Sequence, residues 1–187
     1  MNQATKALIA ALLMSGSSHL LAVAGDEDGN FLVNADFDHG LQDWTFNISS
    51  AVTWVANYDS PPPGTTSLGA VALFQEGSEN TNASQCVQVV SGQKYVASVW
   101  AIATCSANAR VGVDWYGDAG CAVTFIGNAD MSSEKSSNDW QKIQSTVIAP
   151  DTAQSAHVII ENEGHCNDAV LFDGAFFGDR IFSNSFE

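Results

Sequence analysis

The chain has 187 residues, of which 21 are acidic and six are basic, and its formal net charge is −15. Nucleic-acid binders draw most of their affinity from lysine and arginine on phosphates, and anionic membrane surfaces repel acidic chains, so this composition argues against both partners. Neutral glycans and cations remain compatible with it.

The N-terminal segment has the pattern of an export signal. Lys6 supplies a positive charge, residues 7–14 are apolar, and Ala22-Val23-Ala24 has the small residues of a cleavage site. The apolar run is too short to cross a bilayer, and a buried N-terminal helix is the alternative interpretation. We expect cleavage near Ala24 and a secreted or periplasmic mature chain.

The mature chain is organised as one predicted domain between two short segments. Residues 25–29 form an acidic leader, residues 30–178 the domain, and residues 179–187 a C-terminal tail. Short runs rich in Val, Ile, Phe, Trp and Tyr alternate with turns rich in Gly, Pro, Ser and Asp. We expect strands at residues 30–36, 51–58, 68–75, 85–90, 95–105, 110–116, 122–126, 140–148, 156–161 and 169–177, with a serine-rich loop at 130–139. No window has a sustained helical period, so the pattern predicts an all-β sandwich.

Strand alternation separates a core face from a second, more polar face. In the run 95–105, Tyr95 and every second residue after it point one way, and Trp100 points the other. If the strands share one sheet, its second face contains Trp100, Arg110, Asp114, Tyr116, His157 and Glu161. Rings stack on the C–H faces of sugars and polar groups bond to hydroxyls, so we interpret these residues as glycan-binding candidates, with Trp54 and Tyr58 at the rim. Half-buried sheet aromatics without a ligand are the alternative interpretation.

The four cysteines all lie after the signal, at positions 86, 105, 121 and 166. Four cysteines in an exported chain predict two disulfides. Their spacing is wide and irregular, and a zinc site is the competing interpretation. The sequence itself permits three connectivities.

Four stretches of the domain occur in a characteristic order. They are Leu32-Val33-Asn34-Ala35-Asp36-Phe37-Asp38 followed by Gly40-Leu41 and Asp43-Trp44; Ser84-Gln85-Cys86-Val87-Gln88-Val89 followed by Gly92 and Tyr95; Trp140-Gln141-Lys142; and Val170-Leu171-Phe172-Asp173. Together they resemble the galactose-binding-like jelly rolls of carbohydrate-binding modules attached to xylanases and cellulases. The resemblance implies a two-sheet antiparallel jelly-roll sandwich with five strands in each sheet, no enzymatic activity and, in many members, a structural calcium ion.

The resemblance also assigns roles to particular residues. It implies calcium ligands at Asp36, Asp38 and Asp173, because the family gathers carboxylates and carbonyls where its first and last strands meet. It implies that Trp44 and Trp140 close the core of the sandwich. Its strand order places the end of one central strand beside the start of the closing strand, which implies the disulfides Cys105–Cys166 and Cys86–Cys121.

Two functions are compatible with these features. The first is an exported, non-catalytic module that binds a neutral poly- or oligosaccharide on a sheet face or loop rim. The alternative is a structural or adhesive extracellular protein that uses the same sandwich without binding glycan. Catalysis has little support, because the sequence lacks G-x-S-x-G, H-E-x-x-H and a phosphate-binding glycine loop.

Overall fold

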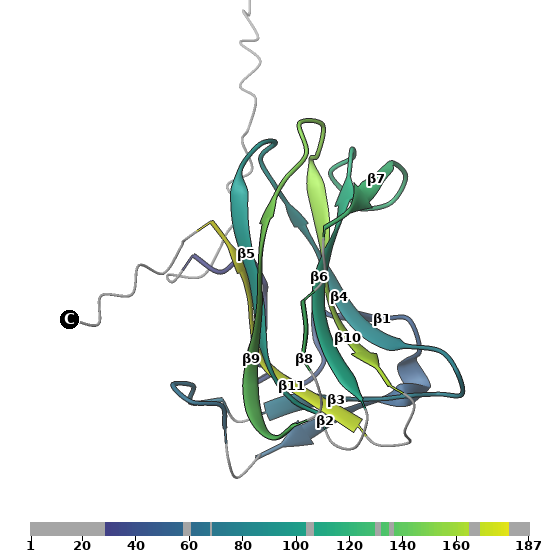
Figure 1. Ribbon diagram of the computed structural model, residues 1–187, viewed down its shortest axis with the longest axis vertical. Helices are drawn as coiled ribbons and strands as arrows, with labels where there is room; N and C mark the ends of the chain where they lie inside the picture. Colours follow the sequence, from purple (N-terminus) through teal and green to yellow (C-terminus); the bar gives the residue numbers. More distant parts are fainter. Residues whose placement is uncertain are drawn as a thin grey trace, which may run out of the picture.

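The computed structural model describes residues 29–57, 61–67, 69–103, 107–129, 132–134, 137–164 and 169–179. These residues form two antiparallel sheets that pack face to face (Figure 1). The predicted signal, most of the leader, Tyr58, Cys105, Cys166 and residues 180–187 lie outside the described residues. The predictions made for them therefore stay predictions.

Strand order defines the two sheets. The first sheet runs β1–β4–β10–β6–β7, and β8 also pairs with β6. Its strands are β1 (Thr45–Phe46), β4 (Thr81–Gln88), β6 (Asn108–Tyr116), β7 (Phe125–Asn128), β8 (Ser132–Glu134) and β10 (Ser155–Glu163). The second sheet runs β2–β3–β11–β5–β9, with β2 (Val52–Ala56), β3 (Gly69–Phe74), β5 (Lys94–Ala103), β9 (Ser137–Ile148) and β11 (Ala169–Gly178). A 3-10 turn, η1 (Ser49–Ala51), precedes β2. The predicted all-β, two-sheet antiparallel jelly-roll sandwich is confirmed.

The core is built from the alternating side chains that the sequence predicted. On β5, the side chains of Tyr95 and every second residue to Ala103 are buried, and on β6 the buried set ends at Trp115. The Tyr95 ring stacks on Phe177 of β11 with centroids 4.9 Å apart. The inward side chains of the strands in both sheets fill the space between them, so one continuous core holds the sandwich together.

The N-terminal segment is the main departure from the predicted strands, because residues 30–36 form no strand. Asn34 has a left-handed backbone with φ of 49°, which turns the chain. Amide side chains hold the segment instead: Gln85 accepts from the Val33 N–H and donates to the Val33 carbonyl. The Oδ1 of Asn30 accepts from the Phe177 N–H at 3.0 Å. Two side chains thus replace the ladder bonds of a strand.

One end of the sandwich is closed by aromatic residues from the turn that comes after residues 30–36. Phe37 is fully buried and stacks on Trp44 with centroids 5.1 Å apart, which confirms the core position of Trp44. The indole N–H of Trp54 donates to the Phe37 carbonyl at 2.9 Å. The core position expected for Trp140 is wrong: this residue is partly exposed on β9, whereas Ile143 reaches the core.

Several strand boundaries also differ from the predicted ones, and two of these differences fall on polar stretches. Strand β4 begins at Thr81, four residues before the expected start, and β8 forms inside the expected loop at 130–139. Both polar stretches form strands because neighbouring strands supply backbone partners: β4 pairs with β10, and β8 with β6. Among the described residues, no helix has the length and hydropathy to span a membrane.

Candidate functional site

The outer face of the first sheet brings together five of the predicted site residues. Strand register places His157 of β10 opposite Asp114 of β6, Glu161 opposite Arg110, and Tyr116 beside the start of β10. These strands lie side by side in Figure 1. We call the surface formed by the outward side chains of β4, β10 and β6 the outer face. It comprises Asn82, Ser84, Cys86, Arg110, Asp114, Tyr116, His157, Ile159, Glu161 and Glu163.

Gly112 lies at the centre of the outer face, opposite Ile159 in the register, and contributes no side chain between Arg110 and Asp114. Gly112 is itself buried by its neighbours. Tyr116 and Arg110 are six residues apart on β6, which corresponds to about 20 Å along an extended strand. A long, shallow surface with polar groups at both ends suits an extended ligand.

Two carboxylates and one guanidinium form the charged end of this face. The Arg110 guanidinium Nη1 lies 2.7 Å from Glu163 and 3.9 Å from Glu161. The Arg110 Nε is buried and has no hydrogen-bond partner among the described side chains. Burial raises the pKa of Glu161, while a hydrogen bond from Asn80 and the charge of Arg110 act against that rise. Glu163 was missed in the sequence, although its alternation with Glu161 on β10 places it on the same face.

A second pair of ionisable groups, Asp114 and His157, lies nearer the middle of the outer face. Burial raises the pKa of Asp114, and the neighbouring His157 opposes that rise. Burial also lowers the pKa of His157, and Asp114 opposes that shift in turn. Perturbed ionisable groups gather at binding and catalytic sites more often than elsewhere, so this pair makes the outer face a candidate site.

Tyr116 stands at the opposite end from Arg110. Its ring packs edge-on against His157 at 5.3 Å and against Phe125 of β7 at 5.8 Å. Burial is the main cause of a raised pKa at Tyr116, and the charges of Asp114 and Asp118 add to it. The ring is therefore fixed between two neighbours, which reduces the entropy lost when a ligand stacks on it.

A rigid loop, residues 117–124, borders the Tyr116 end of the outer face. The Asp118 carboxylate accepts backbone N–H groups from four residues of the loop, which lowers the pKa of Asp118 to about 2. The Ser155 hydroxyl donates to the Asp118 carbonyl and accepts from the Cys121 N–H at 3.1 Å. The disulfide Cys86–Cys121 then joins this loop to β4, which confirms that predicted pair.

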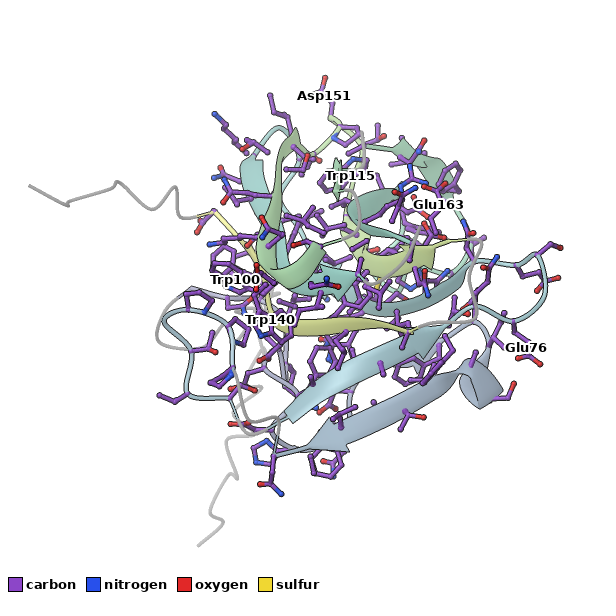
Figure 2. The ribbon with its side chains drawn as sticks, turned by 60° about the horizontal axis from the view of Figure 1, so that its bottom comes forward. Glu76, Trp100, Trp115, Trp140, Asp151 and Glu163 are labelled. Atoms are coloured by element: carbon purple, nitrogen blue, oxygen red, sulfur yellow. A yellow bond between two sulfur atoms is a disulfide. The ribbon has the colours of Figure 1, made fainter. Side chains whose placement is uncertain are left out.

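Trp100 does not lie on the outer face, contrary to the interpretation that grouped it with Tyr116. Strand β5 belongs to the second sheet, and Figure 2 shows Trp100 and Trp140 toward one side of the sandwich and Glu163 toward the other. The Lys142 Nζ lies 5.9 Å from the centroid of the Trp100 ring. A Cβ at Gly174, where φ is +55°, would lie 3.1 Å from the indole, so the ring covers a bulge in β11.

Trp54 is likewise remote from the outer face. It lies on β2, an edge strand of the second sheet, and its indole bonds to the turn at Phe37. Its exposed fraction is 39%. The expected rim of Trp54 and Tyr58 is therefore not part of the outer face as the structure describes it, and Tyr58 lies outside the described residues.

The predicted calcium ligands lie around Ser67, at the turn that precedes β3. The Ser67 hydroxyl is 2.7 Å from the Asp36 carbonyl, 2.7 Å from the Gly69 carbonyl and 3.4 Å from the Asp38 carboxylate. Asp173 is 1% exposed, and its pKa is raised to about 7, mainly by burial and also by the charges of Asp36 and Asp38. The three carboxylates do not form a group with ligand atoms within 4.8 Å of one another. Backbone carbonyls and two carboxylates still offer the oxygen ligands that calcium takes.

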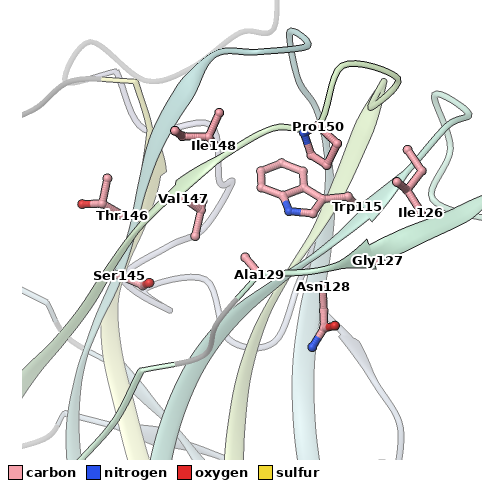
Figure 3. A pocket seen from close by; sticks show the side chains of 10 residues that line it. All are labelled: Trp115, Ile126, Gly127, Asn128, Ala129, Ser145, Thr146, Val147, Ile148 and Pro150. Atoms are coloured by element: carbon pink, nitrogen blue, oxygen red, sulfur yellow. The ribbon is translucent and has the colours of Figure 1, made fainter.

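A separate cleft opens between the two sheets, where β7 and the end of β9 form its walls (Figure 3). Its volume is about 460 Å³, and none of the described residues that line it is charged. Trp115 forms its floor but is only 3% exposed, so its ring offers no free surface for stacking. The cleft was not predicted from the sequence because its residues come from edges whose pairing the sequence does not reveal.

The comparisons with known proteins agree with one another. A family model described as a carbohydrate binding domain matches residues 29–168. The fold is similar to a family 61 carbohydrate-binding module in complex with β-1,4-galactotriose, at 16% identity, over 81% of this chain and 99% of that chain, with a TM-score of 0.59. It is also similar to the C-terminal family 22 carbohydrate-binding module of Clostridium thermocellum Xyn10B, at 16% identity, over 83% of this chain and 96% of that chain, with a TM-score of 0.59.

An enzyme domain has the same fold in part. The enzymatically active domain of bacteriophage CBA120 tailspike protein 4 is 14% identical, with 80% of this chain and 21% of that chain covered and a TM-score of 0.62. This chain thus spans about a fifth of the tailspike chain. No curated protein matches the sequence. At these identities, the solved structures establish a common fold.

Proposed function

The chain belongs to the carbohydrate-binding domain family, whose model matches residues 29–168, and from this premise we propose that it is an exported, non-catalytic module that binds a neutral poly- or oligosaccharide on the outer face. The observation that carries the proposal is the convergence of an aromatic ring, an imidazole, carboxylates and a guanidinium along two adjacent strands. Hydroxyls of a sugar both donate and accept hydrogen bonds, and this set of groups offers both kinds of partner.

The outer face suits binding because its polar groups are already oriented. Arg110 is held by Glu161 and Glu163. Carboxylates accept from sugar hydroxyls in charge-assisted hydrogen bonds, which are stronger than neutral ones. The Tyr116 ring, fixed by its neighbours, offers a surface to the C–H face of one sugar.

Calorimetric titration tests this proposal. Xylan-type and glucan-type oligosaccharides are titrated into the protein, and we expect micromolar or weaker binding that changes little with salt, because the ligand carries no charge. Tyr116→Ala and Glu161→Gln should each weaken binding by about tenfold, or about 1.4 kcal/mol, if these residues are hot spots. Phe74→Ala is the matched control, since Phe74 is an exposed aromatic residue on the second sheet.

The outcomes separate the two functional classes. Loss of binding in Tyr116→Ala with native melting, and no loss in Phe74→Ala, supports the outer face as the site. Equal loss in both variants contradicts that location. If no glycan binds to the folded wild-type protein, the alternative of a structural or adhesive extracellular protein holds. Release of shorter oligosaccharides during incubation would contradict the non-catalytic assignment.

We also propose a structural calcium ion near Ser67. Asp38 and Asp173 would supply carboxylate oxygens, and the Asp36 and Gly69 carbonyls would supply backbone oxygens. When bound, the ion contributes positive charge that compensates the buried Asp173 carboxylate. Since calcium would bind only the folded state, the melting temperature should rise from excess chelator to millimolar calcium, and an unchanged value would reject the site. Asp173→Ala should remove the rise.

A further inference from the structure

A histidine lies directly beside the disulfide on the outer face. Cys86 of β4 and His157 of β10 are partners in the strand register, and Cys121 reaches the same place from the loop at residues 117–124. The two sulfur atoms and an imidazole nitrogen all lie within 4.8 Å of one another. Among the residues that the structure describes, these three form the one group of this kind.

Two thiolates and an imidazole are a ligand set that binds zinc. The Cys86–Cys121 sulfurs are 2.07 Å apart in the disulfide and are bonded to each other, so they offer no thiolate. Around a tetrahedral zinc with Zn–S bonds of about 2.3 Å, two sulfurs lie about 3.8 Å apart. With Cα atoms 5.9 Å apart, the two side chains can reach this separation by rotation, without movement of the strands.

The surroundings hold the three residues in place independently of the disulfide bond. The backbone of Cys86 lies in the ladder between β4 and β10, and the Cys121 N–H donates to Ser155 Oγ at 3.1 Å. The Asp118 carboxylate caps the loop that carries Cys121. Asp114, opposite His157 on β6, is placed to orient the imidazole, as carboxylates behind metal-binding histidines do. Cys86 is exposed, which leaves a path from solvent and a fourth position for water.

We propose that Cys86, Cys121 and His157 bind one zinc ion when the disulfide between the two cysteines is reduced. A thiol or phosphine reductant supplies the two electrons that cleave the S–S bond, and it is itself oxidised. Each thiol then loses its proton to solvent as its sulfur bonds to the metal. This corner of the outer face thus has two exclusive forms, a covalent disulfide and a thiolate–imidazole metal centre.

Cobalt(II) is the probe, because it takes the place of zinc and reports its ligands by colour. The full chain carrying Cys105→Ser and Cys166→Ser is reduced with a phosphine under nitrogen and titrated with cobalt(II). We expect one equivalent to bind, with sulfur-to-cobalt charge-transfer absorption and the strong d–d bands of a tetrahedral site. Zinc added afterwards should remove both the charge-transfer absorption and the d–d bands, because it takes the place of the bound cobalt. The oxidised protein should give neither band.

Three variants identify the ligands. Cys86→Ser leaves one thiolate, so it should weaken binding and reduce the charge-transfer absorption, and His157→Gln should weaken binding at least tenfold and alter the d–d bands. His39→Gln is the matched control, since His39 is exposed in a distant turn. Circular dichroism follows the fold throughout. If reduction unfolds the protein, recovery of the native spectrum on zinc addition supports the site, and a lack of recovery overturns it. A folded, reduced protein that binds no cobalt, or a His157→Gln variant that binds as tightly, also overturns it.

Discussion

Removal of the Cys86–Cys121 disulfide tests how the loop at residues 117–124 is held. The double variant Cys86→Ala/Cys121→Ala frees a loop whose ends are 35 residues apart in the sequence. Loop-closure entropy for this length corresponds to about 4 kcal/mol of stability, gained by restricting the unfolded chain. For a domain of this size, each kcal/mol shifts the melting temperature by about 2–4 °C. We therefore expect the melting temperature to fall by roughly 10 °C or more.

Urea denaturation of the wild-type protein and the variant measures the difference in unfolding free energy. Asn82→Ala/Val123→Ala is the control, because it removes one side chain from β4 and one from the loop without a covalent link. The control should lose far less stability than the cysteine variant. A cysteine variant that loses less than about 1 kcal/mol would refute the reasoning, and would show that the Asp118 and Ser155 hydrogen bonds restrain the chain by themselves.

Three other perturbations have expected outcomes. The pKa of Asp173 is about 7 in the folded protein, whereas the ordinary value is 3.8. The unfolded chain therefore loses this proton at lower pH than the folded protein does. In excess chelator, the unfolding free energy should fall by up to about 4 kcal/mol as pH rises from about 4 to 7. Asp173→Asn should remove this fall, as measured by denaturation at pH 5 and pH 8. The pKa of Asp118 is about 2, so the stability that its ionised carboxylate gives the folded protein is present above about pH 4 and is lost toward pH 2. Calorimetry should show Asp118→Asn less stable than wild type at pH 7 and close to wild type at pH 2. Phe37→Ala should cost about 3–5 kcal/mol in urea denaturation, because it empties a fully buried site.

The sequence predicted well those features that depend on alternation within one strand. The inward set from Tyr95 along β5 follows from the period of two, although the alternate residues Val96, Ser98 and Ile102 are buried as well. The same period placed Arg110, Asp114 and Tyr116 on one outward face of β6. Alternation says whether a side chain points to the core, however, and not which sheet carries the strand. Trp100 was for this reason assigned to the wrong surface.

Other features depend on contacts between distant segments. The segment from Asn30 was expected to be a strand because it is apolar, but Asn34 takes a left-handed turn and the amide of Gln85 supplies the missing bonds. The neighbourhood of Cys86 and His157 arises from the register of β4 against β10, which no local pattern fixes. The family resemblance supplied the Cys86–Cys121 pair, which residue spacing had left open.

The contact between the first described residues and the last strand has a consequence for protein engineering. The Phe31 N–H donates to the Phe177 carbonyl at 2.8 Å, and a Cβ on Gly178 would collide with the Gly29 carbonyl. The chain therefore begins and ends its path through the sandwich at nearly the same point. A short linker could join these two points in a circular permutant, with new termini opened at an exposed turn such as Gly77. The same adjacency would let the domain be inserted into a surface loop of a host protein without separating the two sides of that loop.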